Sequence, residues 1–205
     1  AGTMFAKGGR RLMKATLRQV RGPWDAGWVL DKHTLSSQYL GEDAFGHARF
    51  DTTRTEVGEA TYQLKYKHDW DQVQPLAQAI AEHIFPKLAD VGFILPMPAS
   101  TVRPRQPVTE VAEALGKIVG KPVFSDMLRK ASNSKSLKDL HTKEEKIEAI
   151  GDGITVNNQI TNEGAWNVLV VDDLYHTGAS MEAASKVLRA YPKVKKIYVA
   201  ALTWR

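Results

Sequence analysis

The sequence predicts an α/β fold in which helices cover both faces of a doubly wound, mostly parallel sheet. Short apolar strands alternate with amphipathic helices over residues 71–202, which is typical of such sheets. Val168–Val171 is a run of four β-branched or aliphatic residues, as expected for a central parallel strand that is buried on both faces. A chain of 205 residues is long enough for one well-buried domain with some elaboration.

Residues 13–66 are predicted to form a β-rich N-terminal module. A basic segment precedes it over residues 1–12, for which disorder is one interpretation. Apolar and polar residues alternate after Met13, which favours a strand, although a basic amphipathic helix over 10–21 fits the same residues. Further strand-like residues lie over 45–66, with glycines between them.

Residues 67–205 are the predicted core. Asp71 is expected to cap its first helix, and Pro107 and Gly120 to begin and end the second. A third helix is expected after Gly178. Strands are expected at residues 93–95, 123–124, 154–156, 168–171 and 197–202. The polar stretch 130–146 is either a mobile loop or an exposed helix.

The net charge of +5 belongs to the beginning of the chain. Residues 1–21 contain six basic residues and no acidic one, which leaves 22 basic and 23 acidic residues elsewhere. A solvated surface explains this segment, and contact with a polyanion such as nucleic acid is the alternative. The six basic residues are Lys7, Arg10, Arg11, Lys14, Arg18 and Arg21.

Composition excludes several classes of protein. There is no cysteine, so disulfides and cysteine-ligated zinc or iron–sulfur sites are excluded. No apolar run approaches 18 residues, and no apolar segment near the N-terminus has the character of a secretory signal. We therefore expect a cytoplasmic protein without membrane contact.

The segment Val168–Ser180 carries the chemistry that the sequence predicts. Asp172 and Asp173 follow the apolar strand directly, and ligands bind at the carboxyl ends of strands in open α/β sheets. Thr177, Gly178 and Ser180 then lead into a helix, whose free N–H groups favour a phosphate. One half suits hydroxyls or a metal and the other suits phosphate, so a ribose 5-phosphate fits.

Two other families with related motifs fit less well. A response-regulator receiver domain also has paired acids at a strand end, but there the pair ends the first strand. Here only 32 residues follow Asp173, enough for one helix and one strand. No G-x-x-x-x-G-K-[ST] phosphate loop is present either.

On these residues the sequence resembles the type I phosphoribosyltransferases, and most closely their ComF-like branch. The resemblance covers roughly residues 62–203 and includes Leu64-Lys65-Tyr66 and Leu95-Pro96-Met97-Pro98. It implies the type I phosphoribosyltransferase fold with a variable N-terminal hood, and a cytoplasmic homodimer. It also implies phosphoribosyl pyrophosphate as substrate with Mg²⁺ as cofactor, a glycosyltransferase (pentosyltransferase) activity, and an unidentified, nitrogenous acceptor.

The resemblance also assigns roles residue by residue. Asp172 and Asp173 would hold the ribose hydroxyls, both could contact the metal, and both count as catalytic together with His176. The 5-phosphate would bind His176, Thr177, Gly178, Ala179 and Ser180. Pyrophosphate would meet Ala99, Ser100, Thr101, Arg103, Arg105, Lys130 and Lys135. The polar stretch 130–140 would be the mobile loop that closes over the site.

Some interpretations remain open at this point. His176 could act as a general base, or simply contact phosphate. The aromatics of the N-terminal module could stack on a planar acceptor, or form a small core of their own. They are Trp24, Trp28, Tyr39, Phe45 and Phe50.

The main functional hypothesis is an active phosphoribosyltransferase. The alternative is a non-catalytic regulatory protein that binds phosphoribosyl pyrophosphate or a nucleotide and contacts nucleic acid. The sequence Arg103-Pro104-Arg105-Gln106-Pro107 departs from the Arg-Gly-x-Asn-Gln common in the ComF-like branch, which motivates this alternative. A purely structural role is the third hypothesis.

Overall fold

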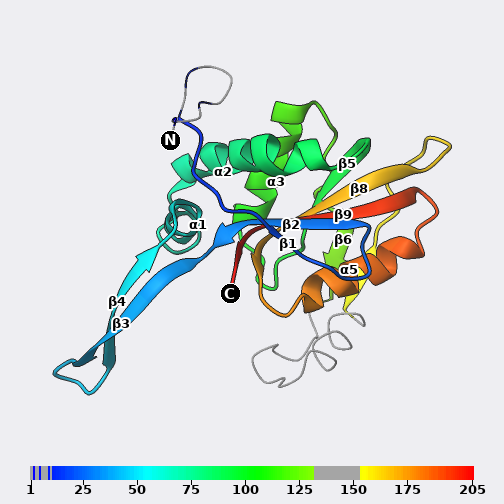
Figure 1. Ribbon diagram of the computed structural model, residues 1–205. Helices are drawn as coiled ribbons and strands as arrows, with labels where there is room; N and C mark the ends of the chain where they lie inside the picture. The colour runs from blue at the N-terminus through cyan, green and yellow to red at the C-terminus, as the bar shows by residue number, and fades with distance from the viewer. Residues whose placement is uncertain (1, 3–4, 6–8, 10, 132–152) are drawn as a thin grey trace.

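The computed structural model describes residues 2, 5, 9, 11–131 and 153–205. Within these residues, a five-stranded sheet has the order β1–β2–β9–β8–β5 (Figure 1). β2, β9, β8 and β5 run parallel, and β1 is antiparallel to β2. The predicted α/β fold with a mostly parallel sheet is confirmed. The strands are β1 (Arg18–Gln19), β2 (Ala26–Lys32), β5 (Val91–Pro96), β8 (Trp166–Tyr175) and β9 (Val194–Trp204).

The apolar run in β8 is buried on both faces of the sheet, as predicted. Each residue from Val168 to Val171 is at most 1% exposed. Because side chains alternate along a strand, Val168 and Val170 pack on one face with helix α5 (Ala179–Arg189). Leu169 and Val171 pack on the other face with the helices that precede and follow β5.

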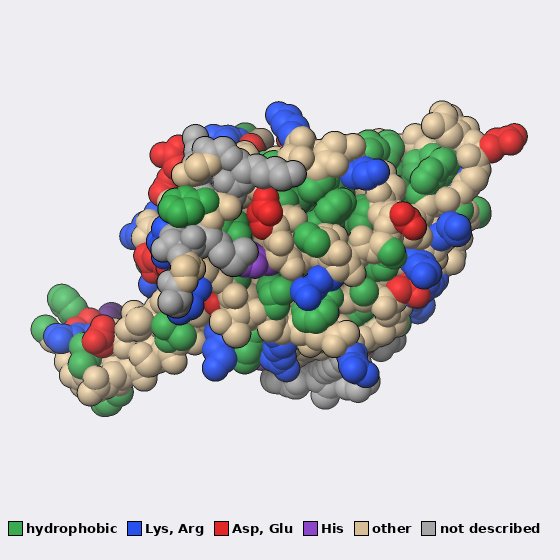
Figure 2. Space-filling model, turned by 45° about the horizontal axis from the view of Figure 1, so that its top comes forward, with side chains coloured by type: hydrophobic (Ala, Val, Ile, Leu, Met, Phe, Trp, Pro, Cys, Tyr) green, Lys and Arg blue, Asp and Glu red, His purple; other side chains and the backbone are tan. Residues whose placement is uncertain are grey.

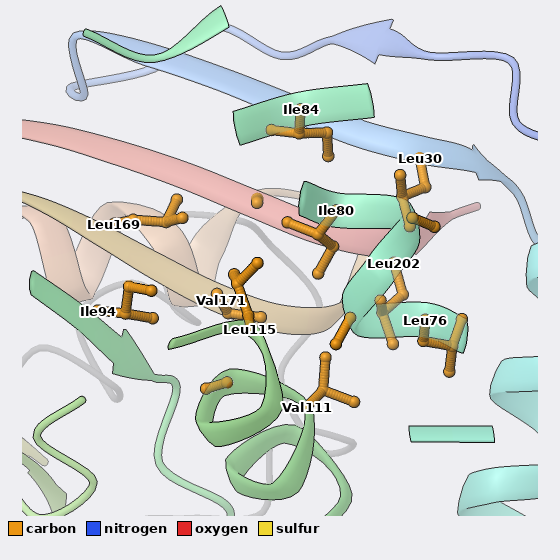
Figure 3. Close-up of a cluster of buried hydrophobic side chains, with 14 of the residues drawn as sticks. Leu30, Leu76, Ile80, Ile84, Ile94, Val111, Leu115, Leu169, Val171 and Leu202 are labelled. Atoms are coloured by element: carbon orange, nitrogen blue, oxygen red, sulfur yellow. The ribbon is translucent and has the colours of Figure 1, made fainter. Parts of the chain in front are cut away.

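Those helices are α2 (Val73–Ala79), which continues through a π-helical turn η2 (Ile80–Ile84), and α3 (Pro107–Val119). Their apolar residues recur every three or four positions, so one side of each helix is buried against the sheet. Figure 3 shows this cluster. It includes Leu30, Leu76, Ile80, Ile84, Ile94, Val111, Leu115, Leu169, Val171 and Leu202.

The predicted ends of α3 are confirmed, whereas the predicted start of the helix before β5 is wrong. α3 begins at Pro107 and ends at Gly120, whose φ of 70° is left-handed, as expected for a glycine cap. The first helical segment starts earlier, with the short helix η1 (Trp70–Gln72). Asp69 caps it by accepting from the N–H of Asp71, so the predicted cap at Asp71 is wrong by two residues.

Residues 56–66 form a helix, α1 (Glu56–Tyr66), where strand-like residues were expected. The Gly58 N–H donates to Thr55 Oγ1 at 2.8 Å, which caps the first turn. Val57, Ala60 and Leu64 then recur at helical spacing on the buried side. The cap and this period outweigh the β-propensity of the individual residues.

The strands β3 (Thr34–Glu42) and β4 (Ala48–Arg54) pair only with each other in the described chain. They form an arm that extends from the body (Figure 1) and carries hydrophobic side chains at its surface (Figure 2). Tyr39 lies opposite Phe50, and the two are 56% and 58% exposed.

The rest of the N-terminal segment is extended. Residues 13–17 alternate between more and less exposed positions, and 18–19 form β1, so the alternative of a helix is wrong over 11–21. β2 pairs with β9 and therefore belongs to the central sheet. The division of the chain into a hood over 13–66 and a core over 67–205 stays a prediction.

A second small sheet joins β6 (Leu128–Lys130) and β7 (Ile154–Val156), and the latter agrees with the predicted strand. The brief strand expected at 123–124 is an isolated parallel bridge between Val123 and Ile94 of β5. Most of the polar stretch 130–146 lies outside the described residues.

Candidate functional site

The two predicted acids lie in β8 itself, close to its carboxyl end. β8 continues past the apolar run to Tyr175 because β9 offers it backbone partners as far as Trp204. Asp172 and Asp173 are therefore held on a hydrogen-bonded strand rather than on a loop. Pairing with β9 fixes the backbone of both residues, so their side chains are the groups available to contact a ligand.

The turn after β8 depends on Gly178. Its φ of 81° is left-handed, and α5 begins at the next residue. A Cβ at this position would lie 2.9 Å from Tyr175 Oη, so a side chain would also crowd the ring. The Ala179 N–H donates to Thr177 Oγ1 at 3.3 Å, and the first turn of a helix presents its N–H groups to the space in front of it, which favours an anion there.

A cavity of about 380 Å³ lies where β5 and β8 end. Both carboxyl groups contribute to it, as do the loop after β5, the start of α3, and two lysines from distant segments. A concave site with converging polar groups is the usual form of a small-molecule site. Its lining comprises Lys65, Met97, Pro98, Ala99, Ser100, Thr101, Arg103, Gln106, Pro107, Val108, Thr109, Lys130, Asp172, Asp173, Leu174 and Ser180.

Lys65 lines this cavity, although it was assigned no role from the sequence. It lies in the last turn of α1, and its Nζ is 2.6 Å from Asp173 Oδ2. Burial acts most strongly and would lower the pKa of Lys65, but the charge and hydrogen bond of Asp173, together with the charges of Tyr66 and Asp172, raise that pKa. Leu64-Lys65-Tyr66 stood out only as a point of resemblance. No local signal could show that Lys65 meets an acid 108 positions later in the chain.

The two neighbouring acids have opposite electrostatic environments. Burial raises the pKa of Asp172 well above its ordinary value, and the charge of Asp173 adds to the rise. Burial also acts to raise the pKa of Asp173, but the neighbouring Lys65 ammonium and the hydrogen bonds that Asp173 makes together lower that pKa below its ordinary value. Asp172 therefore keeps its proton to a higher pH than Asp173, and the pair can offer one donor and one acceptor.

Five of the residues predicted to bind pyrophosphate line the cavity: Ala99, Ser100, Thr101, Arg103 and Lys130. Lys130 Nζ donates to Ser100 Oγ at 2.8 Å, which links β6 to the loop after β5. Burial lowers the pKa of Lys130, and the charge of Asp172 partly offsets this. Arg103 and Lys130 thus bring positive charge to the cavity that the two acids also line.

Arg105, another predicted pyrophosphate residue, is not among the described residues that line this cavity. Arg105 donates from Nε to Glu110 Oε1 at 2.9 Å, and its guanidinium lies 4.0 Å from the centre of the Trp70 ring. Lys135 lies outside the described residues. The roles assigned to both stay predictions.

The predicted 5-phosphate segment meets the cavity through Ser180. His176, Thr177 and Gly178 form the turn before it, where His176 is exposed, and Ala179 begins α5. The described residues contain no cluster of three or more histidine, cysteine or acidic side chains suited to a metal ion. Among them, no helix is long and apolar enough to cross a membrane.

The aromatics of the N-terminal module do not line the cavity in the described structure. Trp24 is buried in the core and donates from Nε1 to the carbonyl of Val20, and Trp28 lies under Lys87. Tyr39, Phe45 and Phe50 belong to the arm and are exposed. The core interpretation therefore holds for Trp24, while the arm residues form neither a core nor a wall of this cavity.

No family model and no curated protein matches the chain. Several solved structures are similar to it. An adenine phosphoribosyltransferase from Trypanosoma brucei is 13% identical over 91% of this chain and 73% of its own, with a TM-score of 0.47. The enzyme from Leishmania tarentolae is 10% identical, over 89% and 78%, with a TM-score of 0.45. A hypoxanthine phosphoribosyltransferase from Staphylococcus aureus is 10% identical, over 64% and 62%, with a TM-score of 0.41. At these values the likeness carries no argument about activity, substrate or the ComF-like branch.

Proposed function

We propose that this protein is a phosphoribosyltransferase that binds phosphoribosyl pyrophosphate with Mg²⁺ and transfers the phosphoribosyl group to a nitrogenous acceptor. The observation that carries the proposal is a cavity lined both by Asp172-Asp173 and by the cationic groups Arg103 and Lys130. A ligand that combines a diol with concentrated negative charge matches both sides of this cavity. The type I motif over 168–180, and the resemblance of Leu64-Lys65-Tyr66 and Leu95-Pro96-Met97-Pro98 to the ComF-like branch, support the same substrate.

In this proposal each side of the cavity has one task. Asp172 and Asp173 bind the ribose hydroxyls, and Ser180 with the N-terminus of α5 binds the 5-phosphate. Ser100, Thr101, Arg103 and Lys130 bind pyrophosphate. Cations at that position stabilise the negative charge that develops on the leaving group, which lowers the barrier to its departure.

The transfer breaks the bond between ribose C1 and the pyrophosphate oxygen, and pyrophosphate leaves with the bonding electron pair. The acceptor nitrogen supplies the electron pair of the new bond to C1 and loses a proton. His176, on the exposed turn after β8, is the predicted base, or else a phosphate contact. Enclosing the site against water would favour transfer over hydrolysis.

The residues present fit a magnesium ion. Mg²⁺ takes oxygen ligands and usually keeps several waters and substrate oxygens, so a dense carboxylate cluster is not needed. Carboxyl oxygens of Asp172 and Asp173 and hydroxyls of Ser100 and Thr101 line the cavity. When bound, the ion would neutralise charge on pyrophosphate.

The proposal is tested by measuring pyrophosphate release from phosphoribosyl pyrophosphate across a panel of nucleobases and amines. Release is expected to need both Mg²⁺ and one acceptor, and to fall at least about tenfold in Asp173→Asn. A matched control is Asp71→Asn, a carboxylate away from the cavity lining. Release that is unchanged in Asp173→Asn would contradict the proposal.

Binding can be measured without knowing the acceptor. A ligand at 100 times its Kd should add roughly 2.7 kcal/mol to the free energy of unfolding. Phosphoribosyl pyrophosphate with Mg²⁺ and ribose 5-phosphate are therefore expected to raise the melting temperature. If neither does, the cavity is not a sugar-phosphate site and the structural hypothesis is favoured.

A second candidate is the non-catalytic regulatory protein, because Arg105 is engaged by Glu110 and Trp70 rather than facing the cavity. Lys14 and Arg21 are exposed on the extended N-terminal segment and could contact nucleic acid. Salt-sensitive DNA binding that is lost in Lys14→Gln/Arg21→Gln, together with ligand binding but no transfer, would favour it. Substitution is preferable to deletion of this segment because Leu12 and Val20 are buried.

A further inference from the structure

The last turn of α1 brings a single lysine to the paired acids. Lys65 Nζ and Asp173 Oδ2 are 2.6 Å apart, and the two side chains are only 29% and 20% exposed. Leu64, the residue before it, is fully buried, so the backbone of this turn is held against the body of the protein. The ammonium is therefore directed at Asp173 by packed structure rather than by a free side chain alone.

Asp172 and Asp173 are not equivalent in their partners. Asp173 carries the ion pair with Lys65, while Asp172 Oδ1 accepts the backbone N–H of Asp173 at 2.8 Å. One lysine thus orders a small network in which each carboxyl is oriented by a different neighbour.

We propose that Lys65 is a positioning residue, which holds Asp173 in the orientation in which it accepts a hydrogen bond from a ribose hydroxyl and thereby sets a preference for ribose over deoxyribose. This inference rests on the proposed sugar-phosphate site. Lys65 acts through Asp173 and makes no bond in the transfer itself. An acceptor that is ionised and fixed before the ligand arrives loses little on binding, whereas an unpaired one rotates or takes a proton.

The proposal predicts a specific kind of defect. A site built to hydrogen-bond a hydroxyl rejects an analogue that lacks it, because the buried acceptor is then unpaired. If Asp173 loses its orientation, that discrimination falls even where phosphate binding is retained. A lysine with only a stabilising role would weaken all ligands equally and leave the preference unchanged.

The experiment measures the affinity of the full chain for ribose 5-phosphate, 2-deoxyribose 5-phosphate and 3-deoxyribose 5-phosphate by calorimetry. The variants are Lys65→Met, Lys65→Gln and Asp173→Asn. The matched control is Lys67→Met, which removes an exposed lysine two residues later at the end of the same helix. Lys65→Gln is included because it keeps a donor for Asp173, should Lys65→Met not fold.

The ribose preference is the ratio of the affinity for ribose 5-phosphate to the affinity for a deoxyribose 5-phosphate, and each protein has one such ratio for the 2-deoxy and one for the 3-deoxy analogue. We expect the ratio that is larger in the unsubstituted protein to fall at least about tenfold in Lys65→Met and to be unchanged in Lys67→Met. Lys65→Gln should retain part of it. Adding Lys65→Met to Asp173→Asn should cause no further loss of preference, because Lys65 acts through that carboxyl. The inference would be overturned if Lys65→Met kept the full preference for ribose. If Lys65→Met does not fold, it would be overturned if Lys65→Gln showed the same preference as Lys67→Met.

Failure of the proposed function has a different signature. If the unsubstituted protein binds none of the three sugar phosphates, the sugar-phosphate site is absent, and this inference falls with it. If the unsubstituted protein binds them and prefers ribose, but the Lys65 variants do too, only the role of Lys65 is overturned.

Discussion

The backbone N–H of Asp173 donates to the carboxylate of its own neighbour Asp172 at 2.8 Å, while the Asp173 carboxylate is paired with Lys65. Two adjacent residues of one strand therefore differ in what compensates their charge. Asp173 has a cation, whereas Asp172 has one amide donor and a like charge beside it. Burial and that like charge penalise ionised Asp172, so the same substitution at the two positions should have opposite effects on stability.

At neutral pH, Asp172→Asn is expected to raise the free energy of unfolding, because it removes a buried charge but keeps an oxygen for the Asp173 N–H. Asp173→Asn is expected to lower it by about 1–3 kcal/mol, since Lys65 then lacks its partner. Urea unfolding of both variants measures this. Equal effects of the same sign would contradict the electrostatic asymmetry.

The stability gained in Asp172→Asn should depend on pH. The pKa of Asp172 is raised in the folded state, so the folded protein holds this proton more tightly than the unfolded chain. Its contribution to stability is then lost as pH rises from the unfolded value of about 3.9 through the folded pKa. The difference between Asp172→Asn and the unsubstituted protein should grow over that window and level off above it, as measured by thermal unfolding at a series of pH values.

Gly178→Ala tests the turn between β8 and α5. The left-handed φ of 81° and the approach of a Cβ to Tyr175 Oη both oppose a side chain, so we expect a loss of about 1–3 kcal/mol and weaker ribose 5-phosphate binding. Gly120→Ala is the matched control. Its φ is 70°, but no atom lies within 4 Å of its Cβ, so only the smaller conformational loss is expected, with no change in binding. If Gly178→Ala and Gly120→Ala had equal effects on ribose 5-phosphate binding, the turn at Gly178 would not contribute to the binding site.

Arg103 and Arg105 were both predicted to bind pyrophosphate, but their surroundings differ. Arg103 lines the cavity, while Arg105 is engaged by Glu110 and Trp70. Arg103→Met is expected to weaken pyrophosphate binding about tenfold, and Arg105→Met by less than about twofold. Calorimetry with Mg²⁺ and pyrophosphate measures both. A larger effect at Arg105 would mean that its side chain turns into the site when pyrophosphate binds.

Local patterns predicted the central strand and its acids well because their causes are local. An apolar run followed by two acids and a Thr-Gly turn can be read from neighbours along the chain, and β8, the turn and α5 follow that order. The end of β8 could not be read in this way. It extends to Tyr175 because β9 lies beside it, and a partner strand is a property of the fold.

The misassignment of 56–66 has a related cause. Gly58, Thr61, Tyr62 and Tyr66 individually suit turns or strands, and they suggested a continued β-rich module. The helical face of Val57, Ala60 and Leu64 becomes decisive once it has the core to pack against. The same helix carries Lys65 into the site, so the wrong secondary structure concealed a site residue.

The sequence by itself determined the α/β class, the buried central strand and the position of Asp172, Asp173 and Gly178 at its end, because periodicity and turn chemistry act over a few residues. Only the tertiary structure decided that Lys65 compensates Asp173, that Lys130 meets Ser100 and that Arg105 is held by Glu110. Each of these contacts joins residues from different elements, or selects one of several charged neighbours. Their geometry is therefore fixed by packing of the helices on the sheet and not by spacing along the chain.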